Sequence, residues 1–236
     1  TLLAGMKNEN GKGTIPNYYG DAPLSEETKQ VLRDIPIDET ALLARLGVAK
    51  SESVGGNYYE SISLPSLNIN GLSAASTTAV RTIIPASATA SIDIRTTKEA
   101  HSSRQVKLLK DYITAKGYHI VDELPSKETR LKHEKLILIE VSPGTAALQT
   151  SLDEPVGLWA QKALESVSDE KVVVIPMMGG TVPTAPLVNS IEKPVILIPL
   201  VNADNNQHAP NENLRIGNFY SGTNALYQLL TTPYDQ

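Results

Sequence analysis

The stretch Val195-Ile-Leu-Ile-Pro-Leu-Val-Asn-Ala-Asp-Asn-Asn-Gln-His-Ala-Pro-Asn-Glu212 contains the features that most constrain the fold. Residues 195–201 are apolar at almost every position, which is typical of a strand buried on both faces. A polar loop follows at 202–212, and a helical pattern then runs from about 213 to 230. His208 therefore lies in a polar loop after a buried strand, where it could bind a metal or act as a base. A lone loop histidine more often has a structural role.

The rest of the C-terminal part repeats this alternation of strand and helix. An apolar strand at 171–175 lies between predicted helices at 154–167 and 184–189. Strands that are apolar on both faces and alternate with helices predict an α/β sheet covered on both sides. Two strands are too few for such a sheet, so we expect the remaining strands to come from polypeptide outside this chain.

Within residues 58–141, the segments 67–72 and 88–95 alternate apolar and polar positions, the pattern of half-buried strands. The whole region predicts an antiparallel pair of strands with a third strand beside it, a helix that ends at a glycine, and two more strands. The predicted pair is 80–84 with 88–95, and the third strand is 67–72. The helix is 101–116, followed by Gly117, and the last two strands are 119–121 and 136–141. This region is typical of an α+β domain with helices on one side of its sheet.

Turn chemistry near 142–145 predicts a domain boundary, which gives domains 1–144 and 145–236. Within the first domain, Ser25 is a plausible N-cap for a helical pattern. The chain begins at Thr1 without an initiator methionine, and we expect it to be a fragment of a longer polypeptide.

The composition excludes several classes of function. Of 236 residues, 41% are hydrophobic and 20% are charged, which is ordinary for a globular protein. A net charge of −5 argues against a nucleic-acid partner. No apolar run approaches the roughly 18 residues that a membrane span needs. The chain has no cysteine, which fits a reducing compartment and predicts a cytoplasmic location.

Two more polar clusters could carry chemistry. In Met177-Met-Gly-Gly-Thr-Val-Pro183, paired glycines after an apolar strand would let a ligand approach the backbone N–H groups; a tight turn with Thr181 as N-cap is the more common interpretation. Arg95 could bind a carboxylate by two parallel hydrogen bonds, although arginines at strand ends are common. Thr82, on the neighbouring predicted strand, would ordinarily only pack. The other three histidines, His101, His119 and His133, receive no functional role.

Five motifs in order resemble those of the di-zinc metallopeptidase family that includes aminoacylase, cytosolic nonspecific dipeptidase (carnosinase) and the acetylornithine and succinyl-diaminopimelate deacylases. The motifs are Pro65-Ser-Leu-Asn-Ile-Asn-Gly-Leu72, Arg81-Thr-Ile-Ile-Pro-Ala86, Ile92-Asp-Ile-Arg95, Gly179-Gly-Thr-Val-Pro183 and His208-Ala-Pro-Asn-Glu212. The resemblance covers about residues 58–230.

The resemblance implies a ferredoxin-like lid domain that forms a homodimer, residues 1–144 without its first part, followed by the C-terminal portion of an α/β catalytic domain, residues 145–236. It implies that His208 is a zinc ligand and that Glu212 orients its loop. The implied binding residues for a small peptide or N-acyl amino acid are Thr82, Arg95, Gly180 and Thr181.

The family's other metal ligands and its glutamate base precede the lid, and none has a counterpart in this chain. The His-Ser-Gly motif, whose histidine each lid lends to its dimer partner, is also missing, because His101-Ser-Ser103 differs from it. Hydrolysis by zinc-activated water needs those groups. We therefore expect no catalytic residue in this chain, no tight zinc binding and no activity of the chain alone. The alternatives are a non-catalytic dimerisation or binding module and an unrelated α/β binding domain.

Overall fold

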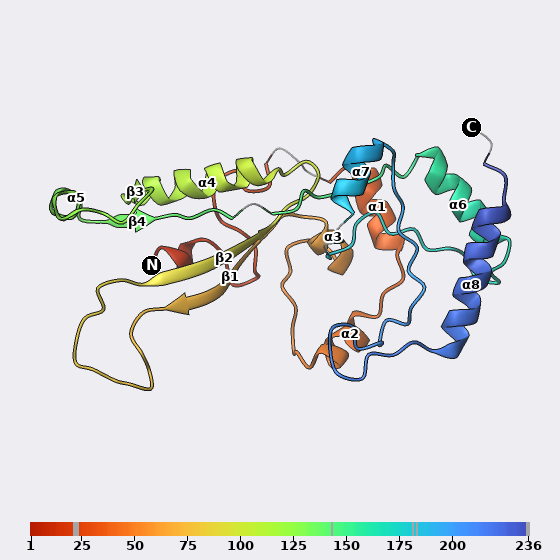
Figure 1. Ribbon diagram of the computed structural model, residues 1–236, viewed down its shortest axis with the longest axis horizontal. Helices are drawn as coiled ribbons and strands as arrows, with labels where there is room; N and C mark the ends of the chain where they lie inside the picture. The colour runs from red at the N-terminus through yellow and green to blue at the C-terminus, as the bar shows by residue number, and fades with distance from the viewer. Residues whose placement is uncertain (21–23, 143, 181, 183, 235–236) are drawn as a thin grey trace. The chain divides into compact units, whose positions relative to one another are not determined.

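The computed structural model describes the whole chain except residues 21–23, 143, 181, 183 and 235–236; at residues 185, 186 and 189 it describes only the backbone. Helices and short strands alternate along the chain (Figure 1). In chain order they are η1 (Leu3–Gly5), α1 (Glu26–Asp34), α2 (Glu39–Leu46), α3 (Tyr58–Ile62), β1 (Ser66–Ser73), β2 (Thr89–Arg95), α4 (Ser102–Ala115), β3 (His119–Val121), α5 (Lys127–Lys132), β4 (Leu136–Leu138), α6 (Pro155–Glu165), α7 (Ala185–Ile191) and α8 (Ile216–Thr231).

The chain divides into two compact units. The first contains Thr1–Leu148 and Met177–Thr181, and the second contains Gln149–Pro176 and Val182–Gln236. The predicted assignment of 1–144 to a lid and 145–236 to a catalytic domain is a statement about function, and it stays a prediction.

Side-chain caps fix where several helices begin. The hydroxyl of Ser25 accepts a hydrogen bond from the Thr28 N–H, as its sequence position predicted. Asp38, Asn57 and Ser126 cap α2, α3 and α5 in the same way. Helix α4 ends before Gly117, whose φ of +82° lies in the left-handed region that glycine adopts without strain.

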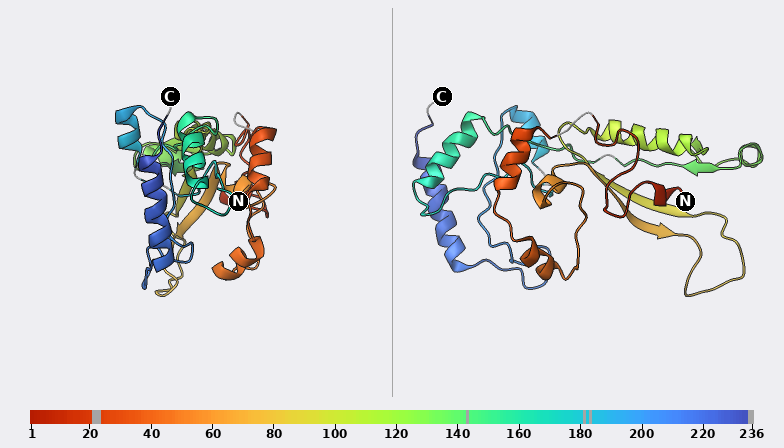
Figure 2. Two further views of the ribbon diagram at one scale, coloured as in Figure 1. Left: turned by 90° about the vertical axis from the view of Figure 1, so that its right-hand side faces the viewer. Right: turned by 180° about the vertical axis from the view of Figure 1, so that it is seen from behind.

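The core of the first unit lies between the β1–β2 hairpin and α4, and α4 runs along the hairpin (Figure 1; Figure 2, right). Strands β1 and β2 are antiparallel, with Leu67 opposite Ile94 and Ile69 opposite Ile92. These side chains alternate onto one face and belong to a core cluster that also contains Leu109, Tyr112 and Ile113 of α4. The opposite face is polar.

A small parallel pair, β3 with β4, continues this unit, and α5 forms the connection between the two strands. His119 is the first residue of β3 and His133 is the C-cap of α5. Their imidazole rings stack with centroids 3.7 Å apart and planes 2° apart.

The second unit has a small core of Ala160, Ala163 and Leu229, where α6 meets α8. Helix α8 is also apolar on its outer face, because Ile216, Phe219, Tyr220, Leu226, Tyr227 and Leu230 are exposed at helical spacing. A helix that is apolar on opposite faces is normally buried on both.

Three predicted strands are wrong. Residues 80–84 lie in the long exposed loop between β1 and β2, so β2 pairs with β1 and the predicted pairing with 80–84 does not form. Residues 171–175 and 195–200 form no strand. A strand needs a hydrogen-bonded partner, and no described residue pairs with these segments. Their apolar side chains are partly exposed, with Val173 at 47% and Leu197 at 53%.

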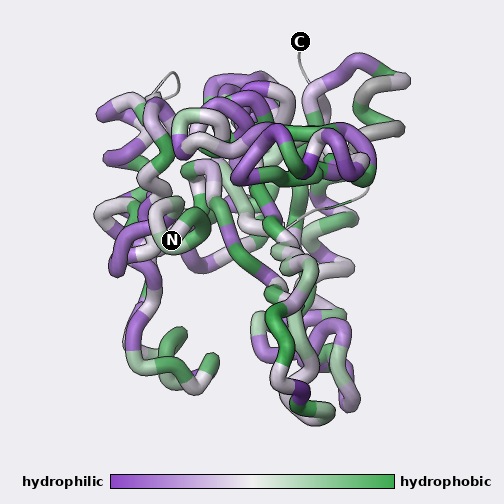
Figure 3. Tube along the Cα trace, turned by 90° about the vertical axis from the view of Figure 1, so that its left-hand side faces the viewer, coloured by the Kyte–Doolittle hydropathy of each residue, from purple (hydrophilic) through white to green (hydrophobic). Residues whose placement is uncertain are grey.

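Apolar and hydrophilic positions are interleaved along the trace (Figure 3). Within the described ranges, no helix has the length and apolar character that crossing a membrane requires.

Candidate functional site

Arg95 is the last residue of β2 and lies on the polar face of the hairpin. Its Nε donates a hydrogen bond to Oδ2 of Asp93 at 2.7 Å. The two residues share a face because side chains two positions apart on a strand point the same way. Arg95 remains 59% exposed at its side chain, so solvent and solutes can reach it.

Thr82 lies in the loop that precedes β2 and is exposed. That loop extends beyond the end of the hairpin at which β2 begins (Figure 1). Arg95 is at the opposite end of β2, which at 3.3 Å per residue is about 20 Å long. Within one protomer, Thr82 therefore lies in the loop that precedes β2 and Arg95 at the far end of that strand. That both residues bind substrate stays a prediction.

The Gly-Gly turn is only partly described, because predicted site residue Thr181 lies outside the described residues. An added Cβ at Gly179 would lie 3.8 Å from the Ile62 side chain, whereas at Gly180 nothing lies within 4 Å. Neither glycine has a positive φ. Packing within the described chain therefore does not require glycine at position 180, and close approach of a ligand stays a hypothesis.

The loop that carries His208 is held by asparagine side chains. Asn202 is 5% exposed; its Oδ1 accepts from the Arg215 N–H at 3.0 Å, and its Nδ2 donates to Asp204 at 2.9 Å. Asn205 is buried as well, and its backbone carbonyl accepts from the Asn213 N–H at 2.8 Å. These contacts close both ends of the loop.

An ion pair also joins the two ends of the loop that carries His208. Arg215 forms an ion pair with Asp204. The pKa of Asp204 is lowered chiefly by the hydrogen bond from Asn202, with a further contribution from Arg215. The carboxylate therefore stays ionised and holds the two ends of the loop together.

His208 itself is exposed and has a φ of +64°. Left-handed backbone at a residue other than glycine is strained, and such strain tends to collect at functional sites. Glu212 is also exposed. Within the part of the chain that the structure describes, no group of three or more His, Cys, Asp or Glu residues could hold a metal ion. His208 could supply one ligand of a site, and the described chain does not complete it.

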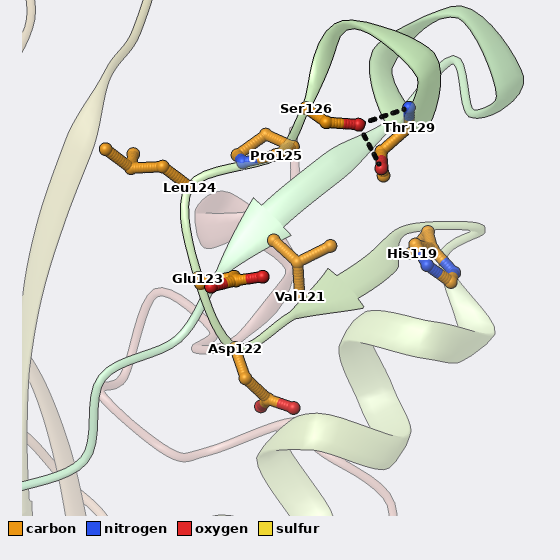
Figure 4. A pocket seen from close by; sticks show the side chains of 8 residues that line it. All are labelled: His119, Val121, Asp122, Glu123, Leu124, Pro125, Ser126 and Thr129. Carbon is orange, nitrogen blue, oxygen red and sulfur yellow. Dashed lines mark hydrogen bonds between the residues drawn. The ribbon is translucent and has the colours of Figure 1, made fainter.

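A hollow of about 580 Å³ lies where β3 meets α5, and it contains none of the predicted site residues (Figure 4). It is lined by His119, Val121, Asp122, Glu123, Leu124, Pro125, Ser126 and Thr129. The Ser126 hydroxyl is occupied with capping α5.

Sequence reasoning missed the residues that support the candidates. The Asx-turn chemistry of Asn202-Ala-Asp-Asn-Asn206 could have indicated a loop braced by its own side chains. The alternation of β2 could have placed Asp93 beside Arg95. Arg95 and Gly180 belong to the first unit and His208 to the second, so the structure describes two separate sets of candidates.

Residues 2–121 match the peptidase dimerisation domain of the M20 family. The chain is 27% identical to Cys-Gly metallodipeptidase DUG1 of Saccharomyces cerevisiae over 209 residues, which cover 85% of this chain and 40% of that protein. It is 24% identical to Beta-Ala-His dipeptidase of Homo sapiens over 230 residues, which cover 94% of this chain and 42% of that protein.

Among solved structures, the M20 family metallo-carboxypeptidase Sso-CP2 from Sulfolobus solfataricus is similar with a TM-score of 0.72 and 22% identity. The similarity covers 98% of this chain and 50% of that one. The chain thus spans about 40% of the length of the two dipeptidases. These matches confirm the predicted family and the predicted fold class, α/β and α+β, and the structure is a mixed α/β architecture with small sheets. The chain belongs to the M20 peptidase family, and residues 2–121 form its dimerisation domain.

Proposed function

We propose that this chain is part of a zinc-dependent metallopeptidase that hydrolyses a peptide or amide bond next to a free carboxylate. The observation that carries the proposal is membership of the M20 family together with relatives named as dipeptidases. The substrate would be a dipeptide or an N-acyl amino acid.

In this proposal Arg95 binds the substrate carboxylate through its guanidinium, which offers the planar donors that suit a carboxylate. Gly180 and Thr181 would donate hydrogen bonds to the substrate, and Thr82 would lie at the scissile end. His208 would be a zinc ligand. Its exposure and its braced, left-handed loop support that role.

The described residues do not fit a complete zinc site, because His208 is the only ligand that this chain contributes to the proposal. A single histidine holds zinc weakly at neutral pH. We therefore infer that the chain alone is inactive and that the remaining ligands and the general base come from the rest of an intact enzyme. When bound, zinc would supply an activated water molecule.

Two features of the second unit support packing against further polypeptide. The apolar segments 171–175 and 195–200 have no strand partner among the described residues. The outer face of α8 leaves Tyr220 at 68% and Leu230 at 87% exposure. Covering such surface would stabilise the unit through the hydrophobic effect.

The dimerisation domain supports a homodimer, and the positions of Thr82 and Arg95 suggest what the dimer does. An extended dipeptide spans about 7 Å, whereas the strand between these residues is about 20 Å long. One small substrate cannot contact both residues of the same protomer unless the loop before β2 folds back. We infer that the two residues serve different active sites of the dimer.

The test compares the chain alone with a chimera in which the N-terminal half of the yeast Cys-Gly metallodipeptidase precedes Thr1. Hydrolysis of Cys-Gly, β-Ala-His and N-acetyl amino acids is measured with added zinc. We expect turnover by the chimera, loss of turnover in His208→Ala, and none by the chain alone. Turnover by the chain alone, free of contaminating peptidase, would contradict the proposal.

A non-catalytic dimerisation or binding module is the second candidate. It is favoured by the match to a dimerisation domain over residues 2–121 and by the incomplete metal site. A folded, dimeric chimera that binds zinc and hydrolyses none of these substrates would support it.

A further inference from the structure

The feature that carries a further inference is the hydrogen bond from Arg95 to Asp93, a residue of the motif Ile92–Arg95 to which the sequence analysis gave no role. Nε of Arg95 donates to Oδ2 of Asp93 at 2.7 Å, and both side chains lie on the polar face of β2. We propose that Asp93 is a positioning residue that fixes the plane of the Arg95 guanidinium for recognition of a substrate carboxylate. This inference rests on the proposed function, which assigns that carboxylate to Arg95.

Asp93 lies across the hairpin from a row of polar contacts made by Asn68. It lies opposite Asn68 in the register of β1 and β2. The Asn68 Oδ1 accepts from Lys7 Nζ at 3.2 Å, and its Nδ2 donates to Ser66 Oγ at 3.3 Å. Lys7 also forms an ion pair with Glu52 at 2.6 Å. The row connects Asn68, which lies opposite Asp93, to Lys7 and Glu52 in the segments that precede β1.

The side chain of Asp93 is less exposed than the side chain of Arg95 that it holds. The side chain of Arg95 is 59% exposed and that of Asp93 is 33% exposed. Asp93 is also close enough to Tyr18 to act on it: the pKa of Tyr18 is raised mainly by burial, then by Tyr19 and by the charge of Asp93. A half-buried carboxylate in a fixed setting therefore restrains a long, exposed side chain.

The geometry of a guanidinium explains why this restraint would help recognition. Its donors lie in one plane at fixed angles. Fixing Nε therefore sets the direction of the other N–H groups before a ligand arrives, and less rotamer freedom is lost on binding. The negative charge of Asp93 acts in the opposite sense, because it repels an incoming carboxylate. At an exposed site salt and water screen that repulsion.

These two effects predict opposite results for Asp93→Asn, which makes the inference testable on the chain itself. The side-chain Nε–Hε signal of Arg95 is followed by NMR, assigned by its loss in Arg95→Lys. N-acetylglycine serves as the carboxylate probe, and N-acetylglycinamide, which lacks the carboxylate, serves as the ligand control. Asp111→Asn, which breaks the Lys107–Asp111 pair on α4, makes the same change in charge elsewhere.

We expect N-acetylglycine, and not the amide, to shift the Arg95 signal. Asp93→Asn should weaken this binding about fivefold, the effect of one hydrogen bond, and should speed exchange of the Nε–H with water. Asp93→Glu should restore part of the binding of N-acetylglycine and part of the protection of the Nε–H from exchange. Asp111→Asn should change neither the binding nor the exchange.

Unchanged or tighter binding in Asp93→Asn would overturn the role of Asp93 and leave Arg95 in the proposed site. An Arg95 signal that does not respond to N-acetylglycine in the wild type would overturn both assignments. Turnover by the chimera is a separate measurement, so failure of the proposed enzyme activity is distinguishable from either result.

Discussion

Asn202 and Arg215 close the loop that carries His208, because Oδ1 of the buried Asn202 accepts a hydrogen bond from the Arg215 N–H at 3.0 Å. The asparagine lies at the start of the loop, and the arginine precedes α8. The position of the candidate zinc ligand is therefore determined by residues that are not themselves candidates for metal binding.

Replacement of Asn202 by alanine should destabilise the second unit. The change leaves the Arg215 N–H without its partner and removes the donor to Asp204, a loss of roughly 1–3 kcal/mol. Urea unfolding followed by tryptophan fluorescence measures it, since Trp159 lies on α6 of the same unit. The matched control is Asn224→Ala, at an exposed position of α8, which should change stability little. Equal stability of the two variants would show that the loop closes without Asn202.

His208→Gly should stabilise the chain, although it removes the proposed zinc ligand. The left-handed conformation at φ +64° is unfavourable for histidine and permitted for glycine. After allowance for the greater freedom of glycine in the unfolded chain, the expected gain is about 0.5 kcal/mol. The urea midpoint is the measurement. Ala209, which has no positive φ, provides the control: Ala209→Gly should lower the midpoint. Destabilisation by His208→Gly would mean that the imidazole makes contacts that outweigh the strain.

The sequence predicted most helices and strands from local signals. Ser25 and Gly117 mark where a helix begins and where another ends, and both act through contacts with their immediate neighbours. The segment 80–84 was misassigned because its β-branched residues suit a strand as well as they suit the loop that precedes β2. The segments 171–175 and 195–200 have strand-like sequences, but partner strands decide whether a strand forms.

The candidate site was harder to predict than the fold. Sequence motifs could single out Arg95 and His208. They could not reveal that Asp93 accepts a hydrogen bond from Arg95 or that Asn202 closes the loop that carries His208. The stack of His119 on His133 depends on the pairing of β3 with β4, which joins residues distant in sequence. Such contacts follow from tertiary structure and leave no periodic pattern.

The stacked histidines should make the connection between β3 and β4 sensitive to pH. The pKa of His133 lies below its ordinary value of 6.5, because of desolvation, then the adjacent His119, then Lys132. The unfolded chain therefore binds this proton more readily than the folded chain, so stability falls as the pH drops below about 6.5. Other nearby charged groups, Asp122, Glu123, Glu134 and Lys135, flank the two rings along the chain.

NMR titration of the imidazole signals measures the pKa of His133 directly. His119→Ala should raise it part of the way to the ordinary value, because the effect of His119 disappears while other contributions remain. His101→Ala, at the N-cap of α4, should leave it unchanged. Faster amide exchange in α5 at pH 5 than at pH 7.5, after correction for intrinsic rates, should accompany protonation. A His133 signal that ignores the loss of His119 would show that the stack does not control its titration.

Thr82 lies in the loop before β2, and Arg95 lies at the far end of that strand, which is about 20 Å long. The two residues should therefore act in different active sites of the proposed dimer. Chimeras carrying Thr82→Ala, Arg95→Ala or His208→Ala are each expected to be impaired alone.

Two mixtures, formed by co-expression, separate the alternatives: Thr82→Ala with His208→Ala, and Arg95→Ala with His208→Ala. If a lid residue is lent to the partner, its mixture contains heterodimers with one intact site. Random pairing then restores about a quarter of the wild-type rate. One mixture should recover activity and the other should not, because only one of the two residues can share a protomer's site with His208. Recovery in both mixtures, or in neither, would show that Thr82 and Arg95 serve the same site.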